Sequence, residues 1–388
     1  MENGHGGFEL SEELKTLRDQ VRRIIRDEII PIEERLDPDA AEIPEDDFWA
    51  IARKTQAAGL WCMGVAEKYG GAGLGAFDMC VLYEEMAQHR MGLYNPGAGV
   101  FGRRPPPVIW AGTEEQIQTY AVPAVKNAWH TFFGITEPSG GSDPARAIQC
   151  RAVRDGDSYV LNGTKIFTSH AHEGEWGVVF TRTDPNAGRA GITAFIIKKN
   201  TPGFTARPFK VLRTVALPCE VQFEDCRIPI SQRLGPEGGG LSLCMDLLTR
   251  LRFPYSACNI GVGVAALKMA IEHSKQRSTF GELLSRRQAI QWMLADSEVE
   301  LRAARWLTWE GAWKADRGED ARMEASIAKL YSSEVLGKVV DRAVQIHGGY
   351  GVSKEFPLER WYREARIRRI GEGPSEVHRM VIARNLLR

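Results

Sequence analysis

The spacing of apolar residues changes twice along this chain, and this change is the strongest constraint that the sequence places on the fold. Leu14, Leu17 and Val21 recur three and four residues apart, as on one face of a helix. From about residue 128 the apolar residues alternate as in half-buried strands, and from residue 240 the helical spacing returns. We therefore expect three domains, over residues 1–127, 128–239 and 240–388. They would be an N-terminal helical domain, a middle antiparallel β domain and a C-terminal four-helix bundle, giving an α+β fold that is mainly α.

Capping residues and periodicity place individual helices. Ser11 precedes a helix whose first turn carries two glutamates, as an N-cap should. A helix over residues 77–89 presents apolar side chains to a core and carries Glu84 and Glu85 on its polar face. Gly348 and Gly349 are expected to end another helix. The C-terminal domain is predicted to hold four long helices, over residues 241–278, 288–314, 321–346 and 376–387.

Two dipeptides in the middle domain are typical of hairpin turns. Asp155-Gly156 and Asn162-Gly163 favour the positive φ angles that short turns between antiparallel strands require. We therefore predict that strands next to each other in sequence pair antiparallel at both places.

Charge and hydropathy exclude several classes of protein. The chain of 388 residues has 50 basic and 50 acidic side chains and no net charge, which argues against a nucleic-acid binder. No apolar stretch approaches the roughly 20 residues of a membrane-spanning helix, so we expect no integral membrane segment. Residues 1–7 contain neither a basic nor an apolar segment of the kind found in targeting signals. A cytoplasmic protein is the expectation.

The cysteines and histidines do not suggest a metal site. The seven cysteines are scattered and form no Cys-x-x-Cys pair, so we expect buried free thiols in a reducing compartment. His170 and His172 stand too close together for the usual zinc spacing, and no second Cys/His cluster lies near them in sequence. We predict that no metal is bound.

Two segments around the middle domain could contact a flat or anionic cofactor. In residues 136–143, glycines would let backbone N–H groups approach a phosphate or a flavin edge, although the same residues suit a turn between domains. Phe167 and Ser169 share one face of a predicted strand, so they could place a ring and a hydroxyl against a cofactor. The alternative for Phe167 is packing in the core.

Three further segments could carry chemistry in the C-terminal domain. Arg277 to Gly281 and Gln345 to Gly349 lie at predicted helix ends, where a guanidinium or loop amides could bind phosphate oxygens or could simply cap the helices. Glu372 stands between Gly371 and Gly373, where a ligand could approach closely. Enclosed by an apolar group, this carboxylate would become a useful general base, whereas a solvated loop residue is the plain alternative.

Together these motifs resemble those of the acyl-CoA dehydrogenases over nearly the whole chain. Five motifs occur in the order and with the spacing of that family. They are Thr136-Glu137-Pro138 with Gly141-Ser142-Asp143, Asn162-Gly163 with Lys165-Ile166-Phe167, Arg277 with Phe280-Gly281 and Gln288, Gln345 to Gly351, and Glu372-Gly373 with Ser375-Glu376.

The resemblance implies that the cofactor is FAD. Phe167 would stack on the flavin and Ser169 would lie near its N5 edge, where the family more often has Trp and Thr. Six residues of the C-terminal domain would hold the adenosine diphosphate half of an FAD that is bound mainly by a neighbouring subunit. They are Arg277, Phe280, Gln288, Gln345, Gly348 and Gly349. This arrangement implies a homo-oligomer, either a dimer or a tetramer. The implied cofactor-binding residues are Phe133, Ile135, Thr136, Gly141, Ser142, Phe167, Ser169, Arg277, Phe280, Gln288, Gln345, Gly348, Gly349, Ser375 and Glu376.

The resemblance also implies a reaction. Glu372 aligns with the catalytic base of most of the family, which removes the α proton of an acyl-CoA while the β carbon passes a hydride to flavin N5. Some members carry the base at the position of Leu251 instead, and leucine cannot serve. The product would be a trans-2-enoyl-CoA, and the electrons would pass to an electron-transfer flavoprotein.

The expected substrate-binding residues are Ser142, Arg252, Arg103, Gly371 and Gly373. Gly371 stands where many straight-chain enzymes have Tyr, so a branched, cyclic or bulky acyl group is plausible. An inward-pointing Arg103 could pair with a carboxylate or polar tail, and otherwise it would face solvent or CoA.

Other departures from the family pattern bear on substrate and cofactor. Tyr94 occupies about the position of the carboxylate-binding Arg of glutaryl-specific enzymes, which weighs against glutaryl-CoA itself. Pro374 replaces the usual Thr and removes a hydroxyl that could contact the cofactor.

Two other functions remain open. A flavin-dependent acyl-CoA oxidase or monooxygenase of the same fold would let reduced flavin meet oxygen, although the monooxygenases have less need of a base at Glu372. A non-catalytic scaffold would keep the fold without the reaction.

Overall fold

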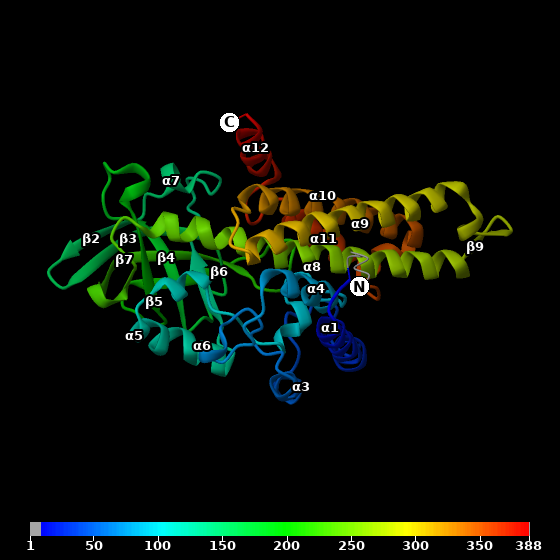
Figure 1. The fold of residues 1–388 in the computed structure, drawn as a ribbon, viewed down its shortest axis with the longest axis horizontal. Helices are drawn as coiled ribbons and strands as arrows, with labels where there is room; N and C mark the ends of the chain where they lie inside the picture. Colours follow the sequence, from blue (N-terminus) through cyan, green and yellow to red (C-terminus); the bar gives the residue numbers. More distant parts are fainter. Residues whose placement is uncertain (1–8, 388) are drawn as a thin grey trace, which may run out of the picture.

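The computed structural model describes residues 9–387. Residues 1–7, on which the expected cytoplasmic location partly rests, lie outside the described residues. Figure 1 shows a sheet at one end of the molecule, a bundle of long helices extending from it, and the N-terminal helices along one side of both. The three-part order predicted from the sequence is present.

The N-terminal domain is helical, as predicted. Ser11 caps the first helix by accepting a hydrogen bond from the Leu14 N–H at 3.2 Å. Pro31 lacks an N–H, and the turn before it, over Ile25–Ile29, is π-helical. The helices are α1 (Glu12–Ile24), α2 (Ile30–Glu33), α3 (Glu45–Ala57), α4 (Ala76–Met86), α5 (Glu114–Gln116) and α6 (Val122–Asn127).

The two carboxylates assigned to the polar face of α4 are buried. Glu84 binds Arg305 at 2.6 Å, which ties α4 to the C-terminal bundle, and Glu85 binds Arg22 of α1 at 2.7 Å. Because buried carboxylates need such partners, these ion pairs replace the solvent that the sequence pattern predicts there.

The middle domain is one mixed sheet in the order β6-β7-β3-β2-β4-β5-β8, with β1 beside β4. Most pairs are antiparallel as predicted, but β1 and β2 each meet β4 in parallel, which the prediction did not include. The strands are β1 (Thr131–Gly134), β2 (Arg151–Asp155), β3 (Ser158–Ser169), β4 (Trp176–Arg182), β5 (Ile192–Lys198), β6 (Phe204–Pro208), β7 (Pro218–Pro229) and β8 (Arg233–Leu234), and the short helix α7 (Pro144–Ala147) follows β1.

Of the two predicted turns, one is correct. Gly156, with φ of 59°, lies in the hairpin between β2 and β3. The hairpin at Asn162-Gly163 is wrong, because both residues lie inside β3 at a shift of its register with β7. Gly163 has φ of 140°, and a Cβ there would stand 2.7 Å from the Cα of Cys150. A glycine is therefore needed here because the strand has a bulge and the backbone of Cys150 lies close to it.

The C-terminal domain holds five α-helices among the described residues instead of the four predicted. α11 was not predicted, and it packs against α10 and α8. The predicted fourth member, α12, contacts α10 but projects from the bundle in Figure 1. The helices are α8 (Gly240–Gln276), α9 (Gln288–Asp316), α10 (Arg322–His347), α11 (Leu358–Arg368) and α12 (Ser375–Leu386), and the small hairpin of β9 (Ser278–Thr279) and β10 (Glu282–Leu283) joins α8 to α9.

Two expectations about the whole chain can be checked on the described residues. All seven cysteines are free and buried, as predicted. No described helix is both long enough and apolar enough to cross a membrane.

Helix α8 joins the domains through close packing. Its first turn places Leu241 and Cys244 in the core beneath the sheet. Further along, Gly261 lies directly against α4, where a Cβ would stand 2.1 Å from the Glu84 carbonyl oxygen. A glycine is therefore needed at this crossing.

We predict that Gly261→Ala lowers the free energy of unfolding by about 1–3 kcal/mol, because the added methyl group forces α4 and α8 apart. The matched control is Gly337→Ala on α10, where a Cβ meets no atom within 4 Å. It should be neutral or raise stability by up to about 1 kcal/mol through helix propensity. Urea unfolding of the two variants measures the difference, and equal effects would contradict this account of the crossing.

Candidate functional site

The loop between α11 and α12 holds Glu372 in an unusual backbone conformation. Glu372 has φ of 57°, in the left-handed region, and its side chain is exposed. Gly373 beside it has φ of 92°. A residue other than glycine in this region carries strain that the surrounding contacts must hold in place.

Buried groups from two helices hold this loop. The Lys329 ammonium group of α10 donates to the Gly373 carbonyl at 2.6 Å, and the lysine is fully buried. The ring Nε2 of His378 on α12 lies 3.1 Å from the Glu372 carbonyl oxygen. The Ser375 hydroxyl donates to Glu334 of α10 at 2.7 Å. The backbone on both sides of Glu372 is therefore fixed, while its carboxylate is left free of these contacts.

The surroundings of this loop are positively charged. Burial lowers the pKa of Lys329 to about 8, although the charge of Glu372 opposes the shift. Burial also lowers the pKa of Arg252 on α8, again opposed by Glu372. The Arg252 Nε atom has no hydrogen-bond partner among the described residues. Burial and the neighbouring cations lower the pKa of His378 to about 3, so its ring is neutral and Nε2 can donate to the carbonyl.

The glycine-containing loop over residues 136–143 is anchored by a buried carboxylate. Glu137 accepts from the Lys165 ammonium group at 2.6 Å and from the Gln149 N–H at 2.7 Å. A Cβ at Gly141 would stand 2.9 Å from the Thr136 side chain, so only glycine lets the loop fold back this closely. Ser142 is exposed. The loop offers hydroxyls and backbone N–H groups on a fixed base.

Phe167 is outside the core, contrary to the packing alternative. Its side chain is 59% exposed, its φ is 57°, and it lies at a second shift in the register of β3 with β7. Its ring contacts the edge of Phe209, at 5.4 Å between centroids. Two residues on, the Ser169 hydroxyl accepts from Arg213 at 2.6 Å. An exposed aromatic ring beside a fixed hydroxyl suits a flat cofactor.

The remaining predicted cofactor residues lie in three parts of the structure. Phe133 and Ile135, on and just after β1, are half-buried near the Thr136 loop. Ser375 is buried, and Glu376 is exposed in the first turn of α12. The predicted nucleotide-binding residues Arg277, Phe280, Gln288, Gln345, Gly348 and Gly349 are all exposed.

That nucleotide-binding group lies far from the sheet. Figure 1 places the β9–β10 hairpin, which contains Phe280, at the end of the bundle opposite the sheet. The 37 residues of α8 that separate them span about 55 Å. A single chain therefore does not bring the two halves of the predicted cofactor site together.

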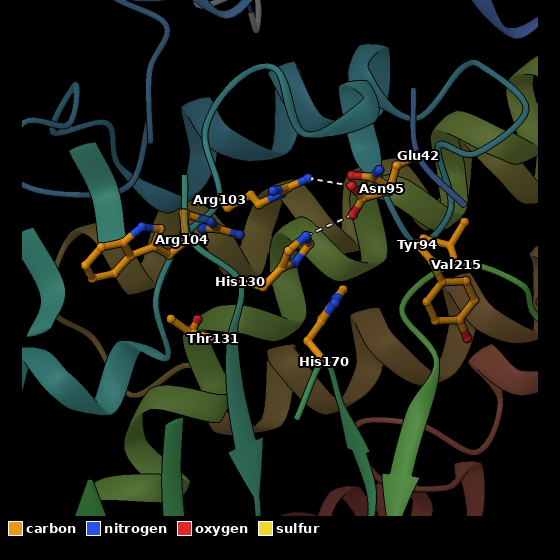
Figure 2. Close-up of a pocket in the computed structure, with 10 residues that line it drawn as sticks. Glu42, Tyr94, Asn95, Arg103, Arg104, His130, Thr131, His170 and Val215 are labelled. Carbon is orange, nitrogen blue, oxygen red and sulfur yellow. Dashed lines mark hydrogen bonds and ion pairs between the residues drawn. The ribbon is translucent and has the colours of Figure 1, made fainter. Parts of the chain in front are cut away.

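A cavity of about 110 Å³ lies between the N-terminal domain and the sheet (Figure 2). Arg103 lines it, but its guanidinium donates to Glu42 at 2.9 Å and to the Ala128 carbonyl at 3.2 Å, so its charge is already paired. The lining residues are Glu42, Tyr94, Asn95, Arg103, Arg104, Trp129, His130, Thr131, His170 and Val215.

Two histidines of this cavity stack on each other. The rings of His130 and His170 have centroids 4.5 Å apart, and with Glu173 their ligand atoms lie within 4.8 Å of one another. His130 binds Glu42 at 2.9 Å and His170 binds Glu173 at 2.6 Å, so the hydrogen bonds are satisfied without an ion. The sequence did not indicate the group of His130, His170 and Glu173, because His130 lies forty positions before His170. The expected absence of a metal stays a prediction.

Several residues that hold the site gave no signal in the sequence. Lys329, Glu334, His378 and Arg213 are single polar residues, and only the folded arrangement brings them to the loop or to β3. Buried polar side chains with defined partners are the signal that identifies them in the structure.

Comparison with family models covers all three domains. The models describe an acyl-CoA dehydrogenase N-terminal domain at residues 11–127, a middle domain at 132–226 and a C-terminal domain at 238–387.

Known proteins align over the full length. "Acryloyl-CoA reductase (NADH)" of Anaerotignum propionicum is 34% identical, with 98% of this chain and 96% of that protein covered. The structure of butyryl-CoA dehydrogenase from Megasphaera elsdenii is 32% identical with a TM-score of 0.87, covering 98% and 100%. A chain from a study of the electron transferring flavoprotein of Acidaminococcus fermentans is 34% identical with a TM-score of 0.87, also covering 98% and 100%. The FAD complex of PigA is 26% identical with a TM-score of 0.87, covering 98% and 99%.

The lowered pKa of Lys329 predicts a pH effect on stability. Because the unfolded lysine binds its proton up to its ordinary pKa of 10.5 and the folded one only up to about 8, the unfolded state holds more protons between these values. The free energy of unfolding of the wild type should therefore rise relative to Lys329→Met by up to about 3 kcal/mol from pH 8 to pH 10.5.

Lys338→Met, which removes an exposed lysine of the same helix, is the control for this measurement. Its difference from the wild type should stay nearly constant over the same pH range in urea unfolding. A flat difference between Lys329→Met and the wild type would show that the pKa of Lys329 is not lowered in the folded protein.

Proposed function

The chain belongs to the acyl-CoA dehydrogenase family, and from this premise we propose that Glu372 is the base with which it oxidises an acyl-CoA to a trans-2-enoyl-CoA. The observation that carries the proposal is the loop of Glu372, whose backbone is held by Lys329 and His378 while the carboxylate is exposed. A base must be held in one place and still reach the substrate.

FAD is the cofactor of this family, and the residues present fit it. Thr136, Gly141 and Ser142 would hold it through the anchored loop, Phe167 would cover it with an exposed ring, and Ser169 would offer its fixed hydroxyl. When bound, FAD supplies the acceptor for the hydride that leaves the β carbon.

The protein's own residues position the acyl-CoA and take its α proton. The fixed backbone around Glu372 keeps the carboxylate from turning away, and Arg252 and Lys329 surround it with positive charge. Leu251, on the helix where some family members carry the base, has no ionisable group, which leaves Glu372 for this role.

We also propose a homo-oligomer, a dimer or tetramer, that completes the cofactor site. Phe280 is 99% exposed and lies at the end of the bundle, with the guanidinium of Arg287 5.7 Å from its ring centroid. Because this end lies about 55 Å from the sheet, its residues can reach an FAD only on a neighbouring subunit.

The acyl group, the electron acceptor and the compartment complete the proposal. Gly371 places no side chain beside Glu372, which supports a branched, cyclic or bulky acyl group, but a Cβ there would lie 3.3 Å from the Tyr255 hydroxyl, so this tyrosine limits the room. An electron-transfer flavoprotein is the proposed acceptor, in keeping with the similarity to a chain from the Acidaminococcus study. The seven free thiols support a cytoplasmic location.

We predict that Glu372→Gln keeps its FAD but slows the reduction of the flavin by substrate about a hundredfold or more, the usual contribution of a general base. The readout is anaerobic bleaching of the flavin absorbance by a panel of saturated acyl-CoAs. Glu310→Gln, an exposed glutamate of α9, is the control. Unchanged reduction in Glu372→Gln would overturn the assignment, and peroxide formed by the wild type in air would favour the oxidase.

We predict that Phe280→Ser weakens both FAD retention and subunit association, because it removes an exposed ring expected at the neighbouring subunit's cofactor. Light scattering gives the mass, and flavin absorbance after dialysis gives the retained FAD. Leu387→Ser, which alters another highly exposed apolar residue away from the hairpin, is the control. A variant that keeps both its mass and its FAD would contradict the proposed role of this end of the bundle.

A further inference from the structure

Four side chains from four parts of the chain stack on one another. The guanidinium of Arg213 lies 4.5 Å from the ring centroid of Tyr94, and that of Arg368 lies 4.6 Å from the same centroid. Arg368 also lies 3.8 Å from the ring centroid of Tyr255. We call Arg213, Tyr94, Arg368 and Tyr255 the Arg–Tyr stack.

The Arg–Tyr stack runs between the two predicted halves of the reaction site. At one end Arg213 donates to the Ser169 hydroxyl at 2.6 Å, the group expected near the flavin edge. At the other end the Tyr255 hydroxyl lies 3.3 Å from the position of a Cβ on Gly371, next to Glu372. Tyr94 in the middle also lines the cavity of Figure 2. The stack therefore borders the space that an acyl group must enter.

The stack holds two positive charges that no carboxylate pairs. Arg368 is buried and donates to the Leu93 carbonyl, and Arg213 donates to Ser169. In the part of the chain that the structure describes, neither guanidinium donates to a carboxylate. The Nε atoms of both arginines and the hydroxyl of Tyr94 are buried with no hydrogen-bond partner.

The nearest anions are already engaged. Glu364 is buried and forms an ion pair with Arg360 at 3.1 Å, and burial raises its pKa to about 7. Glu372 lies beyond Tyr255 and is the proposed base. Arg103, the arginine first considered for a substrate carboxylate, is neutralised by Glu42.

Unpaired buried guanidinium groups are costly, and a ligand that supplies the missing charge recovers that cost. We propose that the acyl group of the substrate carries a carboxylate at its far end, and that Arg213 and Arg368 of the Arg–Tyr stack bind this carboxylate. This proposal rests on the proposed function. Guanidinium groups match a carboxylate both in charge and in hydrogen-bond geometry. The unpartnered Nε atoms and the Tyr94 hydroxyl would then find acceptors.

The first experiment compares acyl-CoAs of equal length on the FAD-loaded protein. Adipyl-CoA is paired with hexanoyl-CoA, and suberyl-CoA with octanoyl-CoA, in anaerobic flavin reduction. We expect kcat/KM to favour the carboxylated member by at least about tenfold, because a site with buried polar groups rejects an analogue that leaves them unpaired. Methyl-ended chains reduced equally well or better would overturn the proposal and leave the dehydrogenase function standing.

A binding measurement separates the two kinds of failure. Glu372→Gln should bind substrate without oxidising it, so calorimetry on this variant reports affinity alone. We expect adipyl-CoA to bind at least about tenfold more tightly than hexanoyl-CoA. If it does so while the wild type oxidises neither, the proposed function fails and the carboxylate site stands. Equal affinity overturns the carboxylate site.

Variants of the stack locate the effect. Arg368→Leu and Arg213→Gln should each reduce the preference for the carboxylated chain toward unity, mainly through KM, since the charge acts in binding. Tyr94→Phe keeps both charges and removes one hydroxyl, so it should retain most of the preference and remains informative if Arg368→Leu does not fold. Arg302→Leu, an exposed arginine of α9, is the control. An unchanged preference in both arginine variants would contradict the assignment.

Discussion

The structure depends on one helix that is packed in all three domains. The first turn of α8 is in the core beneath the sheet, and its first half supplies Arg252 and Tyr255 to the site. At Gly261, further along, a Cβ would stand only 2.1 Å from the Glu84 carbonyl oxygen of α4. Because tightly packed cores do not deform gradually, this helix sets the distance between the sheet and the loop of Glu372. A reaction that needs a base and a cofactor on opposite sides of a substrate requires such a rigid spacer.

Sequence reasoning recovered the features that depend on local chemistry. The cap at Ser11, the end of α10 at Gly348 and the order of the domains follow from residues close together in the chain. Asn162-Gly163 was misread because a turn and a bulge both favour glycine at positive φ, and only the partner strand distinguishes them. α11 was missed because Arg360 and Glu364 occupy buried positions as an ion pair and interrupt the apolar spacing.

The candidate site was predictable where it follows a family pattern and unpredictable where it depends on this fold. The sequence pointed to Glu372, Phe167 and the loop over residues 136–143. It did not point to Lys329 or Arg213, because their partners are distant in sequence. The pairing of Arg103 with Glu42 likewise depends on the fold, because the two residues are 61 positions apart in sequence.

The ion pair between Glu84 and Arg305 also bears on how the chain is made. The two residues are 221 positions apart, and the whole β domain lies between them in sequence. At a synthesis rate of about 5–20 residues per second, the N-terminal helices wait on the order of tens of seconds for this partner. During that time Glu84 and the face of α4 that later receives α8 are uncovered. The N-terminal domain thus completes its packing only after much of the C-terminal domain has been synthesised, because Arg305 and α8 both belong to that domain.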